Sequence, residues 1–165
     1  MKKLAVMALV VYVFSCPVFA NNNADIMVEL EKAAQKYCDF YNEPEQMILI
    51  NGKTFVVYTT AGEKVDGECS SGSGTIFQHI AEMSGSKVIN PDILDSLSGI
   101  NTRFITDIHI SSDGILTFKN NEYSEDDPSC CPNDLFLNKV RLFDMKVLSQ
   151  KLLGRVPSDE HQYGE

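Results

Sequence analysis

The strongest constraint on the fold of this 165-residue chain is a pair of adjacent cysteines, Cys130 and Cys131. Two further cysteines, Cys38 and Cys69, lie between them and an N-terminal leader. A bond between neighbouring cysteines requires a cramped ring, because consecutive side chains diverge in extended backbone. We therefore expect Cys130 and Cys131 each to pair with one of the two distant cysteines. Each bond would close a loop of roughly 60 to 90 residues and stabilise the fold by about 4 kcal/mol.

The leader has the three-part organisation of a secretory signal peptide over residues 1–20. Lys2 and Lys3 form its charged start, residues 4–14 are apolar, and small residues occupy the cleavage positions. The apolar part is only about half as long as the roughly 20 residues that span a bilayer as a helix. We therefore predict export to the periplasm or the medium and a mature chain that begins at Asn21.

A second interpretation of the leader concerns Cys16, the fifth cysteine of the chain. Residues 13–16 partly resemble the lipid attachment site of bacterial lipoproteins, and the protein would then be anchored through Cys16. Phe14 and Pro17 fit that pattern poorly, so we prefer a signal peptide that is cleaved and discarded.

The mature chain is strongly acidic. The whole sequence has a formal net charge of −9, and the leader contributes two lysines and no acids, so the mature chain has a net charge of −11. Nucleic acids and anionic membrane surfaces bind to positive patches, so this charge argues against both as partners. It fits either a basic macromolecular partner or simply good solubility, and good solubility is the more common reason for an acidic surface.

The cysteines also bear on metal binding. Cysteine ligands of zinc are usually spaced as C-x-x-C, and this spacing is absent here. The same absence argues against a thiol–disulfide oxidoreductase, whereas an even number of cysteines in an exported chain is typical of disulfides. We therefore predict no metal site and no cofactor, and disulfides formed by Cys38, Cys69, Cys130 and Cys131.

The first structural element should be a long helix. Apolar side chains at steps of three and four predict a helix from Ala24 to Tyr41, which would place Cys38 in its last turn. A hairpin should follow, because Asn51-Gly52 between two runs of β-branched and apolar residues is a strong two-residue turn signal.

Alternating apolar residues predict an antiparallel sheet after the helix. Segment 75–83 fits a helix or a strand, and we prefer a strand because hairpins are expected on both sides. The predicted fold is α+β: a long N-terminal helix packs on an antiparallel sheet of about five or six strands, stapled by disulfides. This single domain spans residues 21–157, and residues 158–165 form a flexible tail. The expected strands are 47–50, 54–60, 75–83, 103–111, 115–123 and 135–143, with a loop over 61–74 and short helices over 90–97 and 145–153.

Four carboxylates precede the adjacent cysteines, namely Glu122, Glu125, Asp126 and Asp127. Two of them could act as a general acid and base, but that requires a buried group with a raised pKa, and this loop is polar. They could bind calcium through oxygen ligands, but the EF-hand spacing is missing. We prefer a solvated acidic loop that docks a basic partner.

Histidines provide the only indication of hydrolytic chemistry. His79 and His109 lie on expected strands and could face each other across the sheet, whereas His161 lies in the tail. A hydrolase of the Ser-His-Asp type needs a nucleophile held beside its base, and no G-x-S-x-G motif is present. We therefore predict no enzymatic activity. The alternative is a small periplasmic hydrolase that uses His79 or His109 with a carboxylate.

The run from Asp126 to Pro132, D-D-P-S-C-C-P, resembles a D-x-x-C-C-P motif of small exported bacterial proteins, some of which are lipoproteins. The likeness is confined to this stretch, and Asn133 stands where many of these proteins have serine. It implies a disulfide-bearing exported domain and no particular activity. In size, acidity and export, the chain is also similar to periplasmic inhibitor and immunity proteins that neutralise cell-wall hydrolases.

These observations together predict an exported, non-enzymatic binding protein of the bacterial cell envelope. It would act as an inhibitor or immunity protein for a basic envelope enzyme, with the acidic loop as its contact surface. A structural component of the envelope, anchored if Cys16 is lipidated, is a further alternative.

Overall fold

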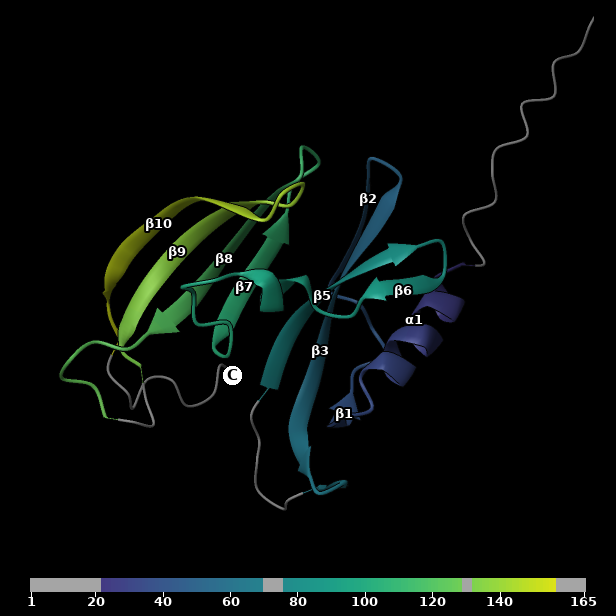
Figure 1. The fold of residues 1–165 in the computed structure, drawn as a ribbon, viewed down its shortest axis with the longest axis horizontal. Helices are drawn as coiled ribbons and strands as arrows, with labels where there is room; N and C mark the ends of the chain where they lie inside the picture. Colours follow the sequence, from purple (N-terminus) through teal and green to yellow (C-terminus); the bar gives the residue numbers. More distant parts are fainter. Residues whose placement is uncertain (1–21, 70–75, 129–131, 157–165) are drawn as a thin grey trace, which may run out of the picture.

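The structure, a computed structural model, describes residues 22–69, 76–128 and 132–156. In these ranges it consists mainly of β-strands in two antiparallel sheets, and α1 (Asn22–Ala33) is the one α-helix (Figure 1). The predicted α+β fold with a long N-terminal helix is therefore wrong. The predicted signal peptide and the predicted C-terminal tail both lie outside the described residues.

The two sheets are formed by consecutive parts of the chain. In the first, the strand order is β1-β3-β5-β6, and β2 and β4 also pair with β3. In the second, the order is β10-β9-β8-β7. A short 3-10 helix, η2 (Ile93–Ser96), connects them. The strands are β1 (Tyr37–Phe40), β2 (Gln46–Ile50), β3 (Lys53–Val65), β4 (Glu68–Cys69), β5 (Ile76–Ser84), β6 (Lys87–Asn90), β7 (Ile105–Ile110), β8 (Ile115–Glu122), β9 (Asp134–Arg141) and β10 (Lys146–Arg155).

The molecule has three layers, with the first sheet in the middle (Figure 1). Along β3, side chains alternate between the two faces of this sheet. Val56 and Tyr58 pack with Leu30 of α1 in one core. Phe55 and Val57 face the second sheet, in the other core. The second core also contains Ile80, Ile93, Leu94, Leu97, Ile105, Ile110, Leu116, Phe118, Val140 and Leu142.

The predicted helix ends eight residues early. Its expected last part, Tyr37–Phe40, is strand β1, which pairs with β3 through Tyr37↔Glu63 and Asp39↔Ala61. The predicted loop over residues 61–74 is also wrong up to Cys69, because β3 continues to Val65 and β4 follows. The two errors have one cause: each segment finds a partner that is distant in sequence, and local periodicity does not report such pairing.

The predicted hairpin is confirmed. Ile50 pairs with Lys53, and the turn residues Asn51 and Gly52 have φ angles of 51° and 79°, as a two-residue turn of type I′ requires. The preferred strand over residues 75–83 is confirmed as β5. The strands expected over 103–111, 115–123 and 135–143 are present as β7, β8 and β9, and the short helix expected before Leu97 is η2.

The C-terminal helix predicted over residues 145–153 is wrong. This segment is strand β10, which pairs with β9 from Lys146↔Arg141 to Arg155↔Asp134. Its register shifts twice, between Val147 and Ser149 and between Leu152 and Gly154. These shifts break the alternation of apolar and polar residues that would have indicated a strand.

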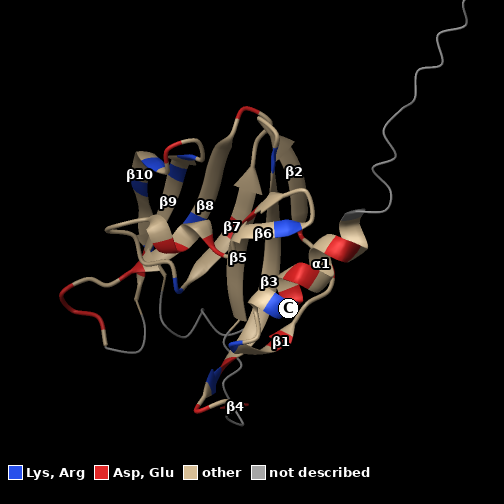
Figure 2. Ribbon diagram, turned by 45° about the vertical axis from the view of Figure 1, so that its right-hand side comes forward, with Lys and Arg blue, Asp and Glu red and all other residues tan. Residues whose placement is uncertain are grey.

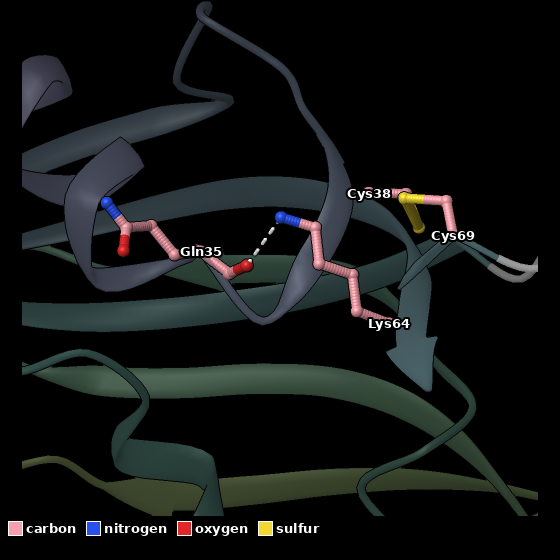
Figure 3. The surroundings of a disulfide bond; sticks show 4 residues. All are labelled: Gln35, Cys38, Lys64 and Cys69. Atoms are coloured by element: carbon pink, nitrogen blue, oxygen red, sulfur yellow. Dashed lines mark hydrogen bonds between the residues drawn. A yellow bond between two sulfur atoms is a disulfide. The ribbon is translucent and has the colours of Figure 1, made fainter. Parts of the chain in front are cut away.

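A disulfide joins Cys38 to Cys69, with 5.6 Å between their Cα atoms (Figure 3). The prediction that both cysteines pair with Cys130 and Cys131 is therefore wrong, and Cys130 and Cys131 lie outside the described residues. The bond forms because β3 pairs with both neighbours, β1 at Glu63 and β4 at Lys64. The Lys64 Nζ also donates a 2.8 Å hydrogen bond to the carbonyl oxygen of Gln35 beside the disulfide.

None of the helices in the described ranges has the length and apolar character required to cross a membrane.

We expect the Cys38→Ser/Cys69→Ser variant to lose stability because the closed loop spans 31 residues. In the chain-entropy model the free energy of unfolding should fall by about 3 to 4 kcal/mol. Urea unfolding under oxidising conditions measures the change. Under reducing conditions the wild type should match the variant, and a persistent difference would contradict the assignment of the stability to this bond.

Candidate functional site

Among the described residues, His79 is the centre of a cluster of hydrogen-bonded side chains of the kinds that enzymes use in catalysis. It lies on β5, is 4% exposed, and its ring packs against the rings of Tyr37 and Tyr58 at centroid distances of 4.9 Å. Its Nε2 is 2.9 Å from the Thr60 hydroxyl, and its Nδ1 is 2.6 Å from Oδ2 of Asp92. Thr60, His79 and Asp92 thus form a hydroxyl–imidazole–carboxylate array, the arrangement of a hydrolytic triad.

Asp92 occupies the point where the chain passes from the first sheet to the second core. It caps η2, because its Oδ1 accepts a 3.0 Å hydrogen bond from the Leu94 backbone N–H. The same oxygen lies 3.4 Å from the backbone nitrogen of Ile80, which donates to it. Each oxygen of the Asp92 carboxylate is therefore committed to groups of the protein itself.

An open cleft of about 270 Å³ lies beside this array. His79 and Asp92 line it together with Tyr37, Phe77 and Arg103. Thr60 does not line the cleft, and none of its surface is exposed. A substrate in the cleft would therefore not reach the hydroxyl that a triad would use as its nucleophile. Both ring nitrogens of His79 are also engaged by protein groups, so the ring is a satisfied buried histidine.

Tyr58 closes the buried side of the cluster. Its hydroxyl donates a 2.9 Å hydrogen bond to the Pro91 carbonyl oxygen, next to Asp92. Burial raises the pKa of this phenol well above its ordinary value, because ionisation would place a charge in the core. The neutral hydroxyl thus anchors the crossover segment at Pro91 to β3.

His109, the second predicted catalytic histidine, is not part of this cluster. It lies on β7 in the second sheet, opposite Thr117, and its side chain is exposed. The two histidines therefore belong to different sheets and do not form one catalytic pair. His161 lies outside the described residues.

The predicted acidic loop contains two kinds of carboxylate. Glu122 and Asp127 accept hydrogen bonds from neighbouring protein groups, whereas Glu125 and Asp126 are exposed to solvent. One Glu122 oxygen accepts hydrogen bonds from the Asn101 backbone N–H at 2.7 Å and from the Asn120 amide at 2.6 Å. Glu122 therefore stabilises the end of β8.

Asp127 holds the loop in shape. Its carboxylate accepts hydrogen bonds of 2.9 Å from the backbone N–H groups of Ser124 and Asn133 and from the Asn133 side chain. Arg155, at the end of β10, forms an ion pair with it. These hydrogen bonds, led by that of the Ser124 backbone, hold the pKa of Asp127 well below its usual range. Asp127 is a structural residue.

Comparisons of this chain with protein families, curated proteins and solved structures found no match.

The sequence identified His79 but missed its partners, Thr60 and Asp92. The sequence predicts a short helix over residues 90–97, and the structure places Asp92 at the N-terminal cap of this helix, η2. Thr60 carried no signal in the sequence. It meets His79 only because β3 and β5 pair, with Tyr58 opposite His79 and Thr60 opposite Phe77.

We expect the array to contribute to stability. His79→Ala removes a buried ring and leaves the Thr60 hydroxyl and Oδ2 of Asp92 without their His79 partner, so the free energy of unfolding should fall by about 3 kcal/mol. Thr60→Val removes one hydroxyl at nearly constant shape and should cost about 1 kcal/mol. The exposed His109→Ala is the matched control, with a change within about 0.5 kcal/mol. Urea unfolding measures all three, and equal effects of His79→Ala and His109→Ala would contradict this role.

We expect Asp127 to make the fold sensitive to acid. Its lowered pKa means that the folded state favours the carboxylate, so this stabilisation is present above the unfolded pKa of about 4 and is lost as the pH falls below it. Asp127→Asn should therefore flatten the decline of Tm between pH 5 and pH 2. The neighbouring Asp126→Asn should retain the wild-type decline, and identical profiles for the two variants would count against the assignment.

Proposed function

We propose that this protein is an exported, non-enzymatic binding protein of the bacterial cell envelope. Its partner would be a basic protein, and an inhibitor or immunity role against a basic envelope enzyme fits best. The signal-like leader and the acidic composition support export and a basic partner. Contact would be made at the acidic loop through Glu125 and Asp126.

One observation carries the proposal: the loop is anchored from within. The carboxylates of Asp127 and Glu122 accept hydrogen bonds from groups of the protein itself. The exposed residues Glu125 and Asp126 lie between them in the chain. A loop that is already ordered loses little conformational entropy when a partner binds. The two exposed carboxylates are then available for charge pairing with lysine or arginine of the partner.

The distribution of charge supports a basic partner, but it does not single out the acidic loop as the contact site. Residues 22–100 carry twelve acidic and five basic side chains, a net charge of −7. Residues 101–156 carry eight and seven, a net charge of −1. Helix α1 contains Asp25, Glu29 and Glu31, and Figure 2 shows red segments along this helix. A field of this sign attracts a basic partner and accelerates its association.

The proposal is tested by capturing partners from a cell-envelope extract with the mature, oxidised protein, first at low and then at moderate salt. We expect one basic envelope protein to be retained and to elute as the salt concentration rises. Glu125→Gln/Asp126→Asn should reduce its capture at least tenfold and leave Tm unchanged.

The matched control is Asp25→Asn/Glu31→Gln, which removes two exposed charges from α1. It should reduce capture by less than about twofold, because the two carboxylates would act only through the long-range field. Capture that is unaltered in the loop variant would remove the loop from the proposal. A column that retains no basic protein would contradict the partner class.

A small hydrolase is the second candidate, favoured by the distances of 2.9 Å and 2.6 Å within the Thr60–His79–Asp92 array beside an open cleft. It requires Thr60 to become accessible. A screen with ester, amide and glycoside substrates tests it. Hydrolysis that Thr60→Val abolishes and Glu125→Gln/Asp126→Asn preserves would support this candidate, and activity that survives in Thr60→Val would exclude Thr60 as the nucleophile.

A further inference from the structure

The edge strand β10 is unusually open. All ten of its residues, from Lys146 to Arg155, are exposed. Among the described residues it pairs with β9 alone, so the backbone N–H and C=O groups along its other side have no strand partner. Such a long free edge is a template for another strand, and proteins usually shorten or cover it. At its end, Arg155 binds Asp127, which keeps the strand in place.

One face of this strand belongs to a basic surface. Residues directly opposite each other in neighbouring strands share a face of a sheet. The pairs Lys119↔Leu137 and Leu137↔Lys151 link β8, β9 and β10 in one row, and Arg141↔Lys146 lies in another. This face is turned away from the first sheet, because Leu116, Phe118 and Val140, which alternate with these residues, are in the second core. We call this surface the basic face, and its cationic residues are Lys119, Lys139, Arg141, Lys146 and Lys151.

Three cations of the basic face form no ion pair with an acidic side chain in the described part of the chain. Lys119 pairs with Asp107, and Arg141 pairs with Asp144. No described acidic side chain forms an ion pair with Lys139, Lys146 or Lys151. The blue segments of β8, β9 and β10 in Figure 2 show this concentration of positive charge in a chain whose net charge is −9.

The opposite face of β10 carries two apolar side chains, Val147 and Leu152, together with Gln150 and Arg155. Val147 lies opposite Val140, and Leu152 lies opposite Phe136. Val140 is completely buried, yet Val147 is 37% exposed and Leu152 is 52% exposed, because the core does not extend beneath the edge strand. Along β10, Lys146 and Lys151 therefore lie on one face, and Val147 and Leu152 lie on the other.

We propose that β10 is the docking site for an extended polypeptide strand of a partner protein, in which acidic and apolar residues alternate. The strand would pair with the free edge and continue the second sheet. Its acidic side chains would lie beside Lys146 and Lys151, and its apolar side chains would cover Val147 and Leu152. The acidic loop meets β10 only at its end, where Arg155 binds Asp127 and Ser124. The docking site at Lys146–Leu152 uses other residues and has the opposite charge, so it does not depend on the proposed function.

The features of the edge distinguish this occupant from others. A second copy of the chain, paired through β10, would bring Lys146 and Lys151 against the same lysines, and like charges in neighbouring strands are destabilising. Nucleic acids and anionic lipids would use the lysines but leave the backbone groups of the edge without partners. An acidic–apolar strand satisfies the backbone, the lysines and the apolar row together.

The test uses the mature, oxidised protein and a designed ten-residue peptide of alternating glutamate and valine, labelled for fluorescence anisotropy at low salt. We expect it to bind at least tenfold more tightly than the same peptide with lysine in place of glutamate. Lys146→Glu/Lys151→Glu should invert this order. Lys32→Glu/Lys87→Glu changes the net charge equally, on α1 and β6, and should preserve it.

Two further measurements separate strand pairing from simple charge attraction. Methylating every second backbone nitrogen of the glutamate peptide should weaken binding at least tenfold, and peptide binding should slow hydrogen exchange of β10 amides. Equal binding of the methylated peptide, or no binding of either peptide to the folded protein, would overturn the proposal. It would also be overturned by a β10-dependent dimer in sedimentation, or by binding to phosphatidylglycerol vesicles without binding to the peptide.

Discussion

The pairing of β3 with β5 is the interaction on which the rest of the structure depends. The register runs from Thr54↔Met83 to Ala61↔Ile76, so these two strands form the middle of the first sheet. Their alternating side chains supply both cores, one under α1 and one against the second sheet. Burying each large apolar side chain contributes roughly 1.5 to 3 kcal/mol. A shift of one residue in this register would exchange the two faces and disrupt both cores at once.

The polar cluster at His79 follows from this central position. The chain must leave the first sheet after β6 and enter the second core at η2, and Asp92 stands at that crossing. A carboxylate there caps η2, accepts from the Ile80 backbone and binds His79. Buried polar groups are costly unless they are paired, and this array pairs each of its members. Residue types that are common in catalytic triads thus stabilise a crossover here.

The net charge of the chain conceals two surfaces of opposite sign. The acidic side chains are concentrated in residues 22–100, whereas the cations of β8, β9 and β10 share one face of the second sheet. Composition alone supported a basic partner and argued against anionic ones. Alternation along β9 and β10 collects Lys139, Lys146 and Lys151 in one place, and a local surface, rather than the net charge, meets a partner.

The sequence by itself determined the local features: the Asn51-Gly52 hairpin, the strand at 76–84 and the short helix before Leu97, because turn chemistry and capping act over a few residues. Only the tertiary structure decided the rest. Segments 37–40 and 146–155 have helix-compatible patterns and became strands, since β3 and β9 offered them hydrogen-bonding partners. The Cys38–Cys69 bond and the Thr60–His79–Asp92 array have the same origin. Both depend on which strands lie next to β3, and strand neighbours far apart in sequence are chosen by the fit of the whole core.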